Sequence, residues 1–460
     1  MMKVNLFILV TFLANMSFAQ SKEETTSKSK KGSKSVVQLS GQLSTTLYYR
    51  NDTDFDASPR FDDLDGQTDS QFATNFNPTL DIQANKQVKV RYQLELGWNA
   101  WGLNNPSQPN QFMAMPGAPL QGRHKEVWAQ INKKRSFFRF GFQNIKDPSG
   151  LFLNHSVGAL LGRLSSGKHR LQLVFAQMAD TTYEGIGFNR DYITDDNLTT
   201  DRLLFGADYR WKKKNYKLAL AAYGMSDESL FDRELRLGTF VLAVENKSLK
   251  KSKNQYKFWV HLLAQGGWQN MASALNEQVD YRAYAFQTGV RFKQGDKLTW
   301  GLRSFGLSPD DDEDGNDLQG SFLGSAKNHS KTRLLTEDEQ RDRYDNIDER
   351  VGQYVGMFAF NPAGLMVTDA ALAYQFSPAY RIEAVAGLAA ALNTKRALGQ
   401  RWIGTEFTIN QRYQLSQGAY IHANVLCLLP GKAGAVLLND LDREATETLY
   451  GVSLGATASF

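Results

Sequence analysis

The sequence lacks several features that stabilise or anchor large proteins. It holds one cysteine, Cys427, so no internal disulfide bond can form. Beyond residue 19, no apolar run approaches the about 20 residues of a membrane-spanning helix, and the mean hydropathy is −0.43. The 53 Lys and Arg residues against 48 Asp and Glu give a net charge of +5, which is too modest to indicate a nucleic-acid partner.

Catalytic and metal-binding patterns are also sparse. No two of the six histidines stand at the spacing of paired metal ligands. His155 and Ser156 are adjacent, but neighbouring residues of a strand point to opposite faces, so they cannot form a nucleophile–base pair there. We therefore predict that the protein is not an enzyme.

The first 35 residues differ from the rest. Residues 1–19 combine Lys3, an apolar run over residues 6–13 and the small-x-small site that ends at Ala19, which predicts a cleaved signal peptide. The alternative, a membrane anchor, needs a longer apolar run. Residues 20–35 are rich in Ser, Thr and Lys and are predicted to be a disordered periplasmic lead-in. No linker or composition break divides residues 36–460, which indicates one domain.

From residue 36 onward, apolar and polar residues alternate with a period of two. At the C-terminus Tyr450, Val452 and Leu454 share one face and Ser453 and Thr457 the other. This alternation is typical of strands between lipid and a wet lumen. A large soluble exported protein would have a similar composition, so the alternation decides the interpretation. Closing the sheet into a barrel leaves no open strand edge.

Short polar turns alternate with long connections along the chain, as in outer-membrane barrels with periplasmic turns and extracellular loops. With the weakly alternating residues 154–163 counted as a strand, the total is about 18, an even number that returns the chain to the periplasmic side. The prediction is an all-β, transmembrane antiparallel β-barrel over residues 36–460 with long extracellular loops. Its location is the bacterial outer membrane, with lipid as one partner.

Aromatic residues cluster where strands meet loops, as expected at the lipid headgroup boundary. They are Tyr48, Tyr49, Trp98, Trp101, Trp128, Tyr209, Trp211, Tyr223, Trp268, Tyr374 and Trp402.

The polar strand faces carry more bases than acids. Their bases are Lys89, Arg91, Arg139, Arg170, Arg202, Arg210, Lys217, Arg291, Arg303, Arg381 and Arg412. Their acids are Glu95, Glu126, Asp208, Asp369, Glu383 and Glu406. Basic side chains concentrate anions and bind carboxylates or phosphates through guanidinium groups, so these residues are predicted to line the pore and bind anions. The equally weighted alternative is that interior charges only pair with one another.

The longest connection, residues 308–362, exceeds what a passive loop requires, so we expect it to fold into or over the pore mouth and gate it. Gly320, Gly324 and residues 327–333 are candidates for a constriction, and residues 340–350 for a short helix. The alternative is a disordered surface loop.

The same connection contains alternating carboxylates at Asp310, Asp312 and Asp314 before Gly315, a pattern that can bind calcium. Ser321 stands where an EF-hand needs Glu, so a solvated acidic turn is the alternative. No other cofactor is expected.

Four segments of the chain (320–324, 334–339, 343–350 and 361–365) resemble the alginate-export family of outer-membrane porins. The resemblance implies a monomeric barrel of 18 strands with a basic conduit for an anionic polysaccharide, gated by loops. The terminal Phe460 resembles the signal that the barrel-assembly machinery recognises in outer-membrane proteins.

Together these observations predict a porin-like channel that passes anionic solutes or anionic polysaccharide through a basic lumen gated by residues 308–362. The alternative function is a plugged structural or adhesin barrel whose loops bind partners.

Overall fold

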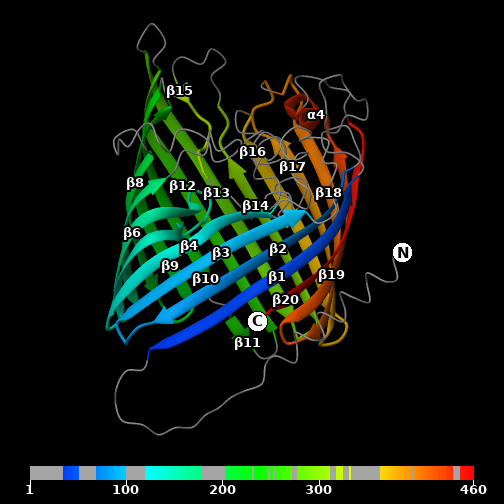
Figure 1. Ribbon diagram of the computed structural model, residues 1–460. Coiled ribbons are helices and arrows are strands. Elements are labelled where there is room, and N and C mark those ends of the chain that lie inside the picture. Colours follow the sequence, from blue (N-terminus) through cyan, green and yellow to red (C-terminus); the bar gives the residue numbers. More distant parts are fainter. Residues whose placement is uncertain are drawn as a thin grey trace.

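The computed structural model describes residues 35–50, 69–99, 120–178, 202–230, 233–246, 249–251, 254–271, 277–310, 318–324, 331–332, 363–395, 397–438 and 446–460. The predicted signal peptide and residues 20–34 of the lead-in lie outside these ranges. The described residues form one β-barrel (Figure 1).

Within the described ranges, 18 long antiparallel strands build the barrel wall. They are β1 (Val36–Arg50), β2 (Asp69–Gln83), β3 (Val88–Asn99), β4 (Leu120–Lys133), β5 (Ser136–Lys146), β6 (Asn154–Ser166), β7 (His169–Met178), β8 (Arg202–Lys212), β9 (Tyr216–Leu230), β10 (Arg233–Asn246), β12 (Asn254–Met271), β13 (Glu277–Gln294), β14 (Leu298–Leu307), β16 (Leu365–Gln375), β17 (Tyr380–Ala391), β18 (Trp402–Ser416), β19 (Ala419–Pro430) and β20 (Leu449–Ser459). Three short elements accompany them, β11 (Leu249–Lys251), β15 (Leu318–Gln319) and α4 (Lys432–Leu438).

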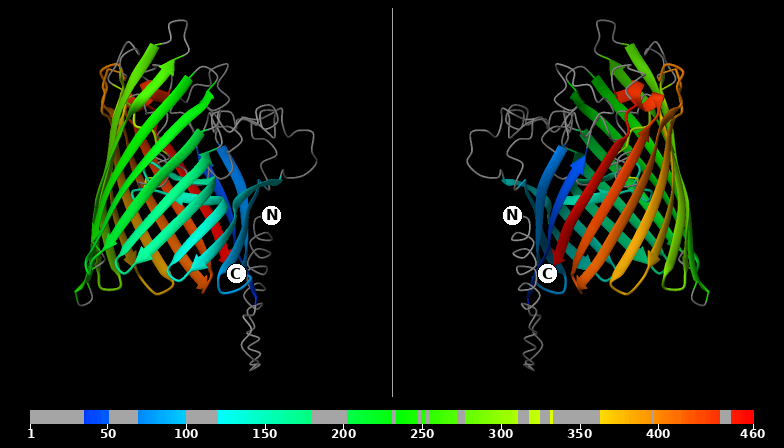
Figure 2. Two further views of the ribbon diagram at one scale, coloured as in Figure 1. Left: turned by 90° about the vertical axis from the view of Figure 1, so that its left-hand side faces the viewer. Right: turned by 90° about the vertical axis from the view of Figure 1, so that its right-hand side faces the viewer.

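Pairing of the first strand with the last closes the barrel. β1 pairs with β20 from Gln42 opposite Ser459 to Arg50 opposite Gly451. The carboxy-terminal residue continues this contact, because Gly41 and Phe460 exchange two backbone hydrogen bonds of 3.1 Å. Each long strand also pairs antiparallel with the next, so the predicted 18-stranded barrel is confirmed. The strands tilt strongly against the barrel axis (Figure 2).

The outer face of the wall is apolar. Phe240, Leu173 and Val452 are among many large apolar side chains that are about half or more exposed there, as a lipid-facing surface requires. Aromatic pairs lie near the end of the barrel at which short turns join the strands. Examples are Phe292 with Trp300, with 5.6 Å between ring centroids, and Tyr374 with Phe376, with 4.8 Å. Short turns mark the periplasmic end of such barrels, and we use that name for this end.

Three residues depart from the expected alternation. Trp128 and Tyr223, predicted at the headgroup boundary, are 5 % exposed and lie inside the barrel, because the residues directly before them, Val127 and Ala222, face outward. Ile403 is 1 % exposed although regular alternation would place it on the outward face with Phe407 and Ile409, because a β-bulge opposite Ala389 and Ala390 shifts the phase.

The weakly alternating residues 154–163 do form a strand, most of β6. Its inward Val157, Ala159 and Leu161 are buried, while its outward Leu160 is 47 % exposed. Both faces of β6 are therefore apolar over these residues, because the inward face packs against a loop inside the barrel. This explains why the alternation is weak.

No helix in the described residues is long and apolar enough to cross a membrane. The short helix α4 follows β19, and its Ala433, Ala435 and Val436 are buried against the upper part of β18.

Candidate pore and anion site

Six basic side chains form a row around the inner wall on strands β3 to β8. This basic row consists of Lys89, Arg91, Arg139, Arg163, Arg170 and Arg210. The carboxylates that contact it in the described residues are Asp81, Glu126 and Asp208. Six bases against three acids leave an excess of three positive charges, so the row attracts anions.

The β3 end of the row is paired. Arg91 donates to both carboxylate oxygens of Asp81 at 2.9 and 2.8 Å and reaches Glu126 at 3.3 Å. Lys89 lies 3.1 Å from Asp81. At the other end Arg210 donates to Asp208 at 2.9 Å. These three bases are held in place by acids on their own or neighbouring strands.

Arg139 has no carboxylate within ion-pair distance in the described residues. Its Nε and Nη2 donate to Oε1 of Gln130 at 2.8 and 2.7 Å, and its guanidinium lies 4.0 Å from the centroid of the Trp128 ring. The Trp128 ring itself is fixed by a hydrogen bond from Nε1 to Glu126 at 3.0 Å. An amide and a ring orient this guanidinium without neutralising its charge.

Arg163 and Arg170 continue the row on the next two strands. Arg163 donates to Gln172 at 3.0 Å and lies 4.5 Å from the Phe137 ring, whose other neighbour is Arg139 at 5.1 Å. Arg170 stands opposite Arg210 in the β7–β8 pairing. The Nε atoms of Arg163 and Arg170 are buried and have no hydrogen-bond partner among the described residues. Buried donors of this kind favour a bound acceptor.

The opposite wall is arranged differently. β17 is nine long strands from β6, which is half the circumference of the barrel. On this side Arg303 donates to Asp369 at 3.1 Å, and Arg381 lies 3.4 Å from Glu383. The side chain of Asp369 is 2 % exposed. These arginines satisfy carboxylates of the wall itself.

Lys331 of the long connection also contacts this wall. Its ammonium pairs with Glu383, and its backbone N–H donates to Asp369 at 3.3 Å. Burial, together with the guanidinium groups of Arg303, Arg381 and Arg291, lowers the pKa of Lys331 to about 8. The contact places part of the long connection inside the barrel.

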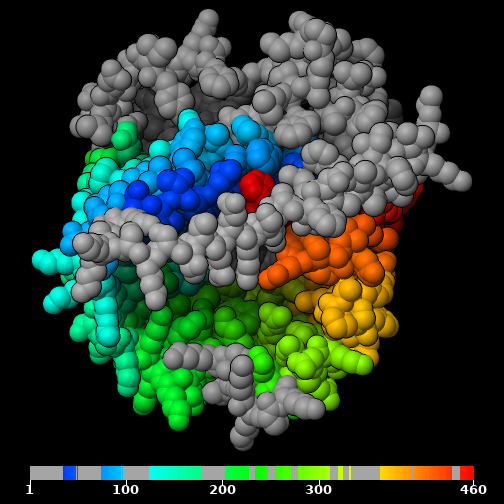
Figure 3. Space-filling model, turned by 60° about the horizontal axis from the view of Figure 1, so that its bottom comes forward, coloured from blue at the N-terminus to red at the C-terminus, as the bar shows by residue number. Residues whose placement is uncertain are grey.

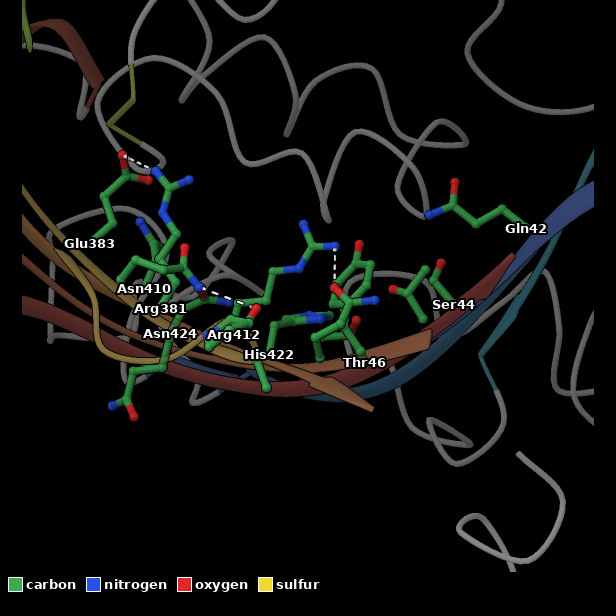
Figure 4. A pocket seen from close by; sticks show the side chains of 16 residues that line it. Gln42, Ser44, Thr46, Arg381, Glu383, Asn410, Arg412, His422 and Asn424 are labelled. Carbon is green, nitrogen blue, oxygen red and sulfur yellow. Dashed lines mark hydrogen bonds and ion pairs between the residues drawn. The ribbon is translucent and has the colours of Figure 1, made fainter. Parts of the chain in front are cut away.

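A polar cavity of about 520 Å³ lies on the inner side of β17 to β20, β1 and the turn after β16 (Figure 4). Arg381, Glu383, Asn410, Arg412 and His422 contribute to its wall. Arg412 lies 3.7 Å from the Tyr420 ring centroid and donates to Gln414 at 3.2 Å. The cavity is thus lined by donors and acceptors together.

Two segments fold inward and narrow the interior. The first joins β5 to β6, where Asp147, 1 % exposed, accepts hydrogen bonds from the backbone N–H groups of Ser149, Gly150, Phe152 and Leu153. This carboxylate closes the loop on itself. The loop then buries Phe152 against Tyr223, with ring centroids 5.5 Å apart.

The second segment covers residues 318–324. Gln265 on the inner wall binds the backbone of Leu323 twice, at 2.8 and 2.9 Å, and Tyr281 donates to the carbonyl of Ser321. Phe322 joins the same apolar cluster as the β5–β6 loop. A Cβ atom on Gly324 would collide with the carbonyl oxygen of Leu151, so glycine is needed where the two segments meet.

Several predicted positions stand apart from these clusters. Arg291 and Lys217 lie on the inner face, the first exposed and the second 3.3 Å from Glu245. The side chains of Arg202 and Glu95, residues 340–350, and the predicted calcium ligands Asp312 and Asp314 fall outside the described residues. Asp310 is buried and accepts from the N–H of Gly320 at 3.4 Å. Among the described residues, no three acidic, histidine or cysteine side chains gather as a metal site.

Residues 451–455 read Gly-Val-Ser-Leu-Gly, the spacing of a hydrolase nucleophile elbow. They lie inside β20 rather than at a strand-to-helix turn. Ser453 is 3 % exposed and accepts a hydrogen bond from Asn424 at 2.7 Å. Ser453 is therefore a buried residue of the barrel wall.

Sequence reasoning missed Arg163, the inward face of Trp128, and the contact of Lys331 with Glu383. Arg163 is the last of the weakly alternating residues 154–163 in β6, where the phase is hard to assign. The Asp-Pro-Ser-Gly stretch at residues 147–150 is a signal that could have indicated a tight, self-bonded loop.

Solved structures of three proteins share this fold. Acinetobacter baumannii OccAB2 is 8 % identical, with a TM-score of 0.58 over 92 % of this chain and 98 % of that one. Pseudomonas aeruginosa OccK9 (OpdG) is 11 % identical, with a TM-score of 0.59 over the same shares. Pseudomonas aeruginosa OpdK, solved with vanillate, is 13 % identical, with a TM-score of 0.54 and 92 % and 98 % coverage.

The likeness shows the fold of this chain, a closed barrel of 18 antiparallel strands that these three structures share. No protein-family model matches the sequence, and no curated relative does.

Proposed function

We propose that this protein is an outer-membrane porin that passes small anionic solutes, carboxylates in particular, by diffusion past the basic row. The observation that carries the proposal is the trio Arg139, Arg163 and Arg170, which has no carboxylate partner in the described residues. Guanidinium groups with free donors bind carboxylates in a planar, two-bond geometry. Their mutual repulsion is relieved when an anion lies between them.

The filled interior favours small solutes over a polymer. Leu151, Phe152 and Phe322 pack together inside the barrel, where a polysaccharide strand would need a continuous wide path. The resemblance to the alginate-export family favours an anionic polysaccharide instead. The vanillate in the OpdK structure is an aromatic carboxylate, and it supplies a suitable probe.

We also propose that the 308–362 connection narrows and gates this path. Support comes from its described parts, because Leu323 binds Gln265 and Lys331 binds Glu383, two contacts on different strands of the inner wall. A loop fixed at several points of the wall can change the pore width by releasing one of them.

Ion selectivity in planar bilayers tests the proposal. In a KCl gradient the purified barrel should give a reversal potential of the sign set by chloride, and vanillate should block the current at lower concentration than its uncharged alcohol analogue. Block by alginate oligomers at lower concentration than by vanillate would favour the polysaccharide. A cation-selective current would overturn the proposal.

A second candidate is a plugged structural or adhesin barrel, favoured by the apolar packing of the β5–β6 loop against Phe322. Under this alternative the reconstituted protein carries no current, and removing residues 311–349 leaves it silent.

The remaining expectations belong to the same proposal. They are export with cleavage after Ala19, assembly through the Phe460 signal, a monomeric state, and weak calcium binding at Asp310, Asp312 and Asp314. Calcium binding is checked by titration with Ca²⁺ alone.

A further inference from the structure

The periplasmic rim of the barrel is strongly asymmetric in charge. The turns that join β4 to β5, β6 to β7 and β8 to β9 carry five exposed bases and no acid, and the last residue of β4 adds a sixth base; we call this set the basic rim. Its members are Lys133, Lys134, Arg135, Lys168, Lys213 and Lys214. The turns after β16 and β18, residues 376–379 and 417–418, carry no charged residue. In Figure 3 the first strands, coloured cyan to green, and the second, yellow to orange, occupy opposite sides of this end.

The basic rim lies at the level of lipid headgroups. Lys213 is 5.9 Å from the ring centroid of Trp211, and Nδ1 of His169 is 2.6 Å from the hydroxyl of Tyr209. These outward aromatic side chains mark the boundary of the hydrocarbon. Lys213 and Lys214 follow Tyr209 and Trp211 by two to five residues, and Lys168 directly precedes His169. At about 3.3 Å per residue, this spacing matches the depth of the headgroup layer.

An apolar groove begins just above the basic rim on the outer wall. It has a volume of about 570 Å³ and lies across β7 to β12. Ala207, Ala222 and Ala264 form its shallow part in one cross-strand row with Phe240, and Tyr209 and Leu220 border it on the periplasmic side. Because the groove faces the hydrocarbon of the membrane, a lipid acyl chain is the ligand that fits it.

We propose that this face binds an anionic phospholipid of the inner leaflet, with its headgroup phosphate on the basic rim and an acyl chain in the groove. Tyr209 connects the two parts, because it lines the groove and stands four residues from Lys213. Charge complementarity selects the anionic headgroup, and each engaged base contributes about 1 kcal/mol of attraction near the surface, or roughly fivefold. The rim turns are short and stay beside the aromatic side chains, which favours a lipid over an acidic protein.

Lipid titration of the full-length barrel tests the proposal. Native mass spectrometry in detergent would compare phosphatidylglycerol with phosphatidylcholine of the same acyl chains. We expect phosphatidylglycerol to bind roughly tenfold or more tightly, since at least two bases engage it. Replacing all six rim bases with Gln should bring the two affinities close together, and added salt should do the same.

Two matched variants make the result specific. Lys297→Gln removes an exposed base from the turn between β13 and β14, away from the basic rim, and should leave the preference unchanged. Ala222→Leu with Ala264→Leu fills the groove, and should weaken long-chain phosphatidylglycerol but not its short-chain form. Heat-modifiable migration on gels confirms that each variant is a closed barrel.

An unchanged preference in the rim variant overturns the proposal. So does equal loss of long-chain and short-chain lipid in the groove variant, because that pattern means a phosphate site without an acyl site. If the rim variant keeps its lipid preference and loses an acidic periplasmic protein, the rim is a protein interface and the lipid assignment is wrong. Porin conductance is a separate measurement, so these outcomes do not depend on the proposed transport function.

Discussion

Two regions of the inner wall hold arginines in opposite ways. On β5 and β6, amide oxygens and aromatic rings orient Arg139 and Arg163. On β6 and β7, the Nε atoms of Arg163 and Arg170 have no hydrogen-bond partner among the described residues. On β14 to β17, Arg303 and Arg381 bind carboxylates of the wall. The same residue type therefore has two roles in one barrel. Interior charge alone does not indicate transport, because the partner of each charge decides its role.

The difference also explains where a solute carboxylate would bind. A carboxylate near Arg303 must compete with Asp369, which is already in place and nearly inaccessible. A carboxylate near Arg163 meets buried donors that lack an acceptor in the described residues. Binding there replaces no existing ion pair, so the free energy of the new hydrogen bonds is not spent on breaking old ones.

The largest effect should come from removing the unpaired charges. In the triple variant Arg139→Gln, Arg163→Gln and Arg170→Gln, the excess charge of the basic row falls from three to zero. We expect the chloride-to-potassium permeability ratio to fall by roughly threefold or more, because local counter-ion concentration follows the wall potential. Reversal potentials in a KCl gradient measure this ratio.

The control for this prediction removes a base outside the lumen. Arg282 is 74 % exposed and paired with Asp280, so Arg282→Gln should leave the ratio unchanged. An unaltered ratio in the triple variant would mean that the basic row does not set selectivity.

The second prediction concerns stability on the paired side. Arg303→Gln leaves the buried Asp369 carboxylate without its guanidinium, and we expect a loss of about 3 kcal/mol in the free energy of unfolding. The double variant Arg303→Met with Asp369→Leu removes both charges and should recover most of that loss. Urea unfolding in lipid vesicles measures both. Equal destabilisation by the single and double variants would contradict a structural role for the pair.

The sequence predicts much of the fold and part of the site. Period-two alternation and turn spacing give most of the strand phases and the count of 18, because both follow from local patterns. Closure joins residues from the two ends of the chain, and it is expected only because a barrel leaves no open strand edge. The segments inside the barrel interrupt the apolar–polar alternation. β6 is apolar on both faces because a loop covers its inner face, and the Trp402 end of β18 is apolar on both faces because α4 covers it.

Partners of charges are harder to predict. Asp369 stands opposite Arg303 only through the register of β14 with β16, two strands separated by the long connection. Alternation indicates that both face inward but not that they meet. The same holds for Trp128, whose ring faces three bases of neighbouring strands.

A third prediction separates the two inward segments. Asp147→Ala removes the acceptor of four backbone N–H groups, which should cost about 2 kcal/mol or more locally and loosen the β5–β6 loop. We expect single-channel conductance to rise and fluctuate. Asp147→Asn keeps one acceptor oxygen and should have about half the effect. If conductance stays as in the wild type, this loop does not limit the pore.

The smallest effect should be a pH dependence on the paired side. Because the pKa of Lys331 is about 8 in the folded protein, below that of a free lysine, the ammonium is charged below this pH and neutral above it. Raising the pH from about 7 to about 9 therefore removes one positive charge and leaves Glu383 paired with Arg381 alone, so anion selectivity should fall slightly.

Stability should change in the other direction. Folding disfavours the charged form of Lys331, so its contribution to stability grows as the pH rises from about 8 toward the pKa of the unfolded chain. Lys331→Met should abolish the change in selectivity between about pH 7 and pH 9 while keeping the basic row intact. Reversal potentials measured across that pH range test this prediction. If anion selectivity declines by the same amount in Lys331→Met, another group titrates, and the long connection does not influence the selectivity of the pore.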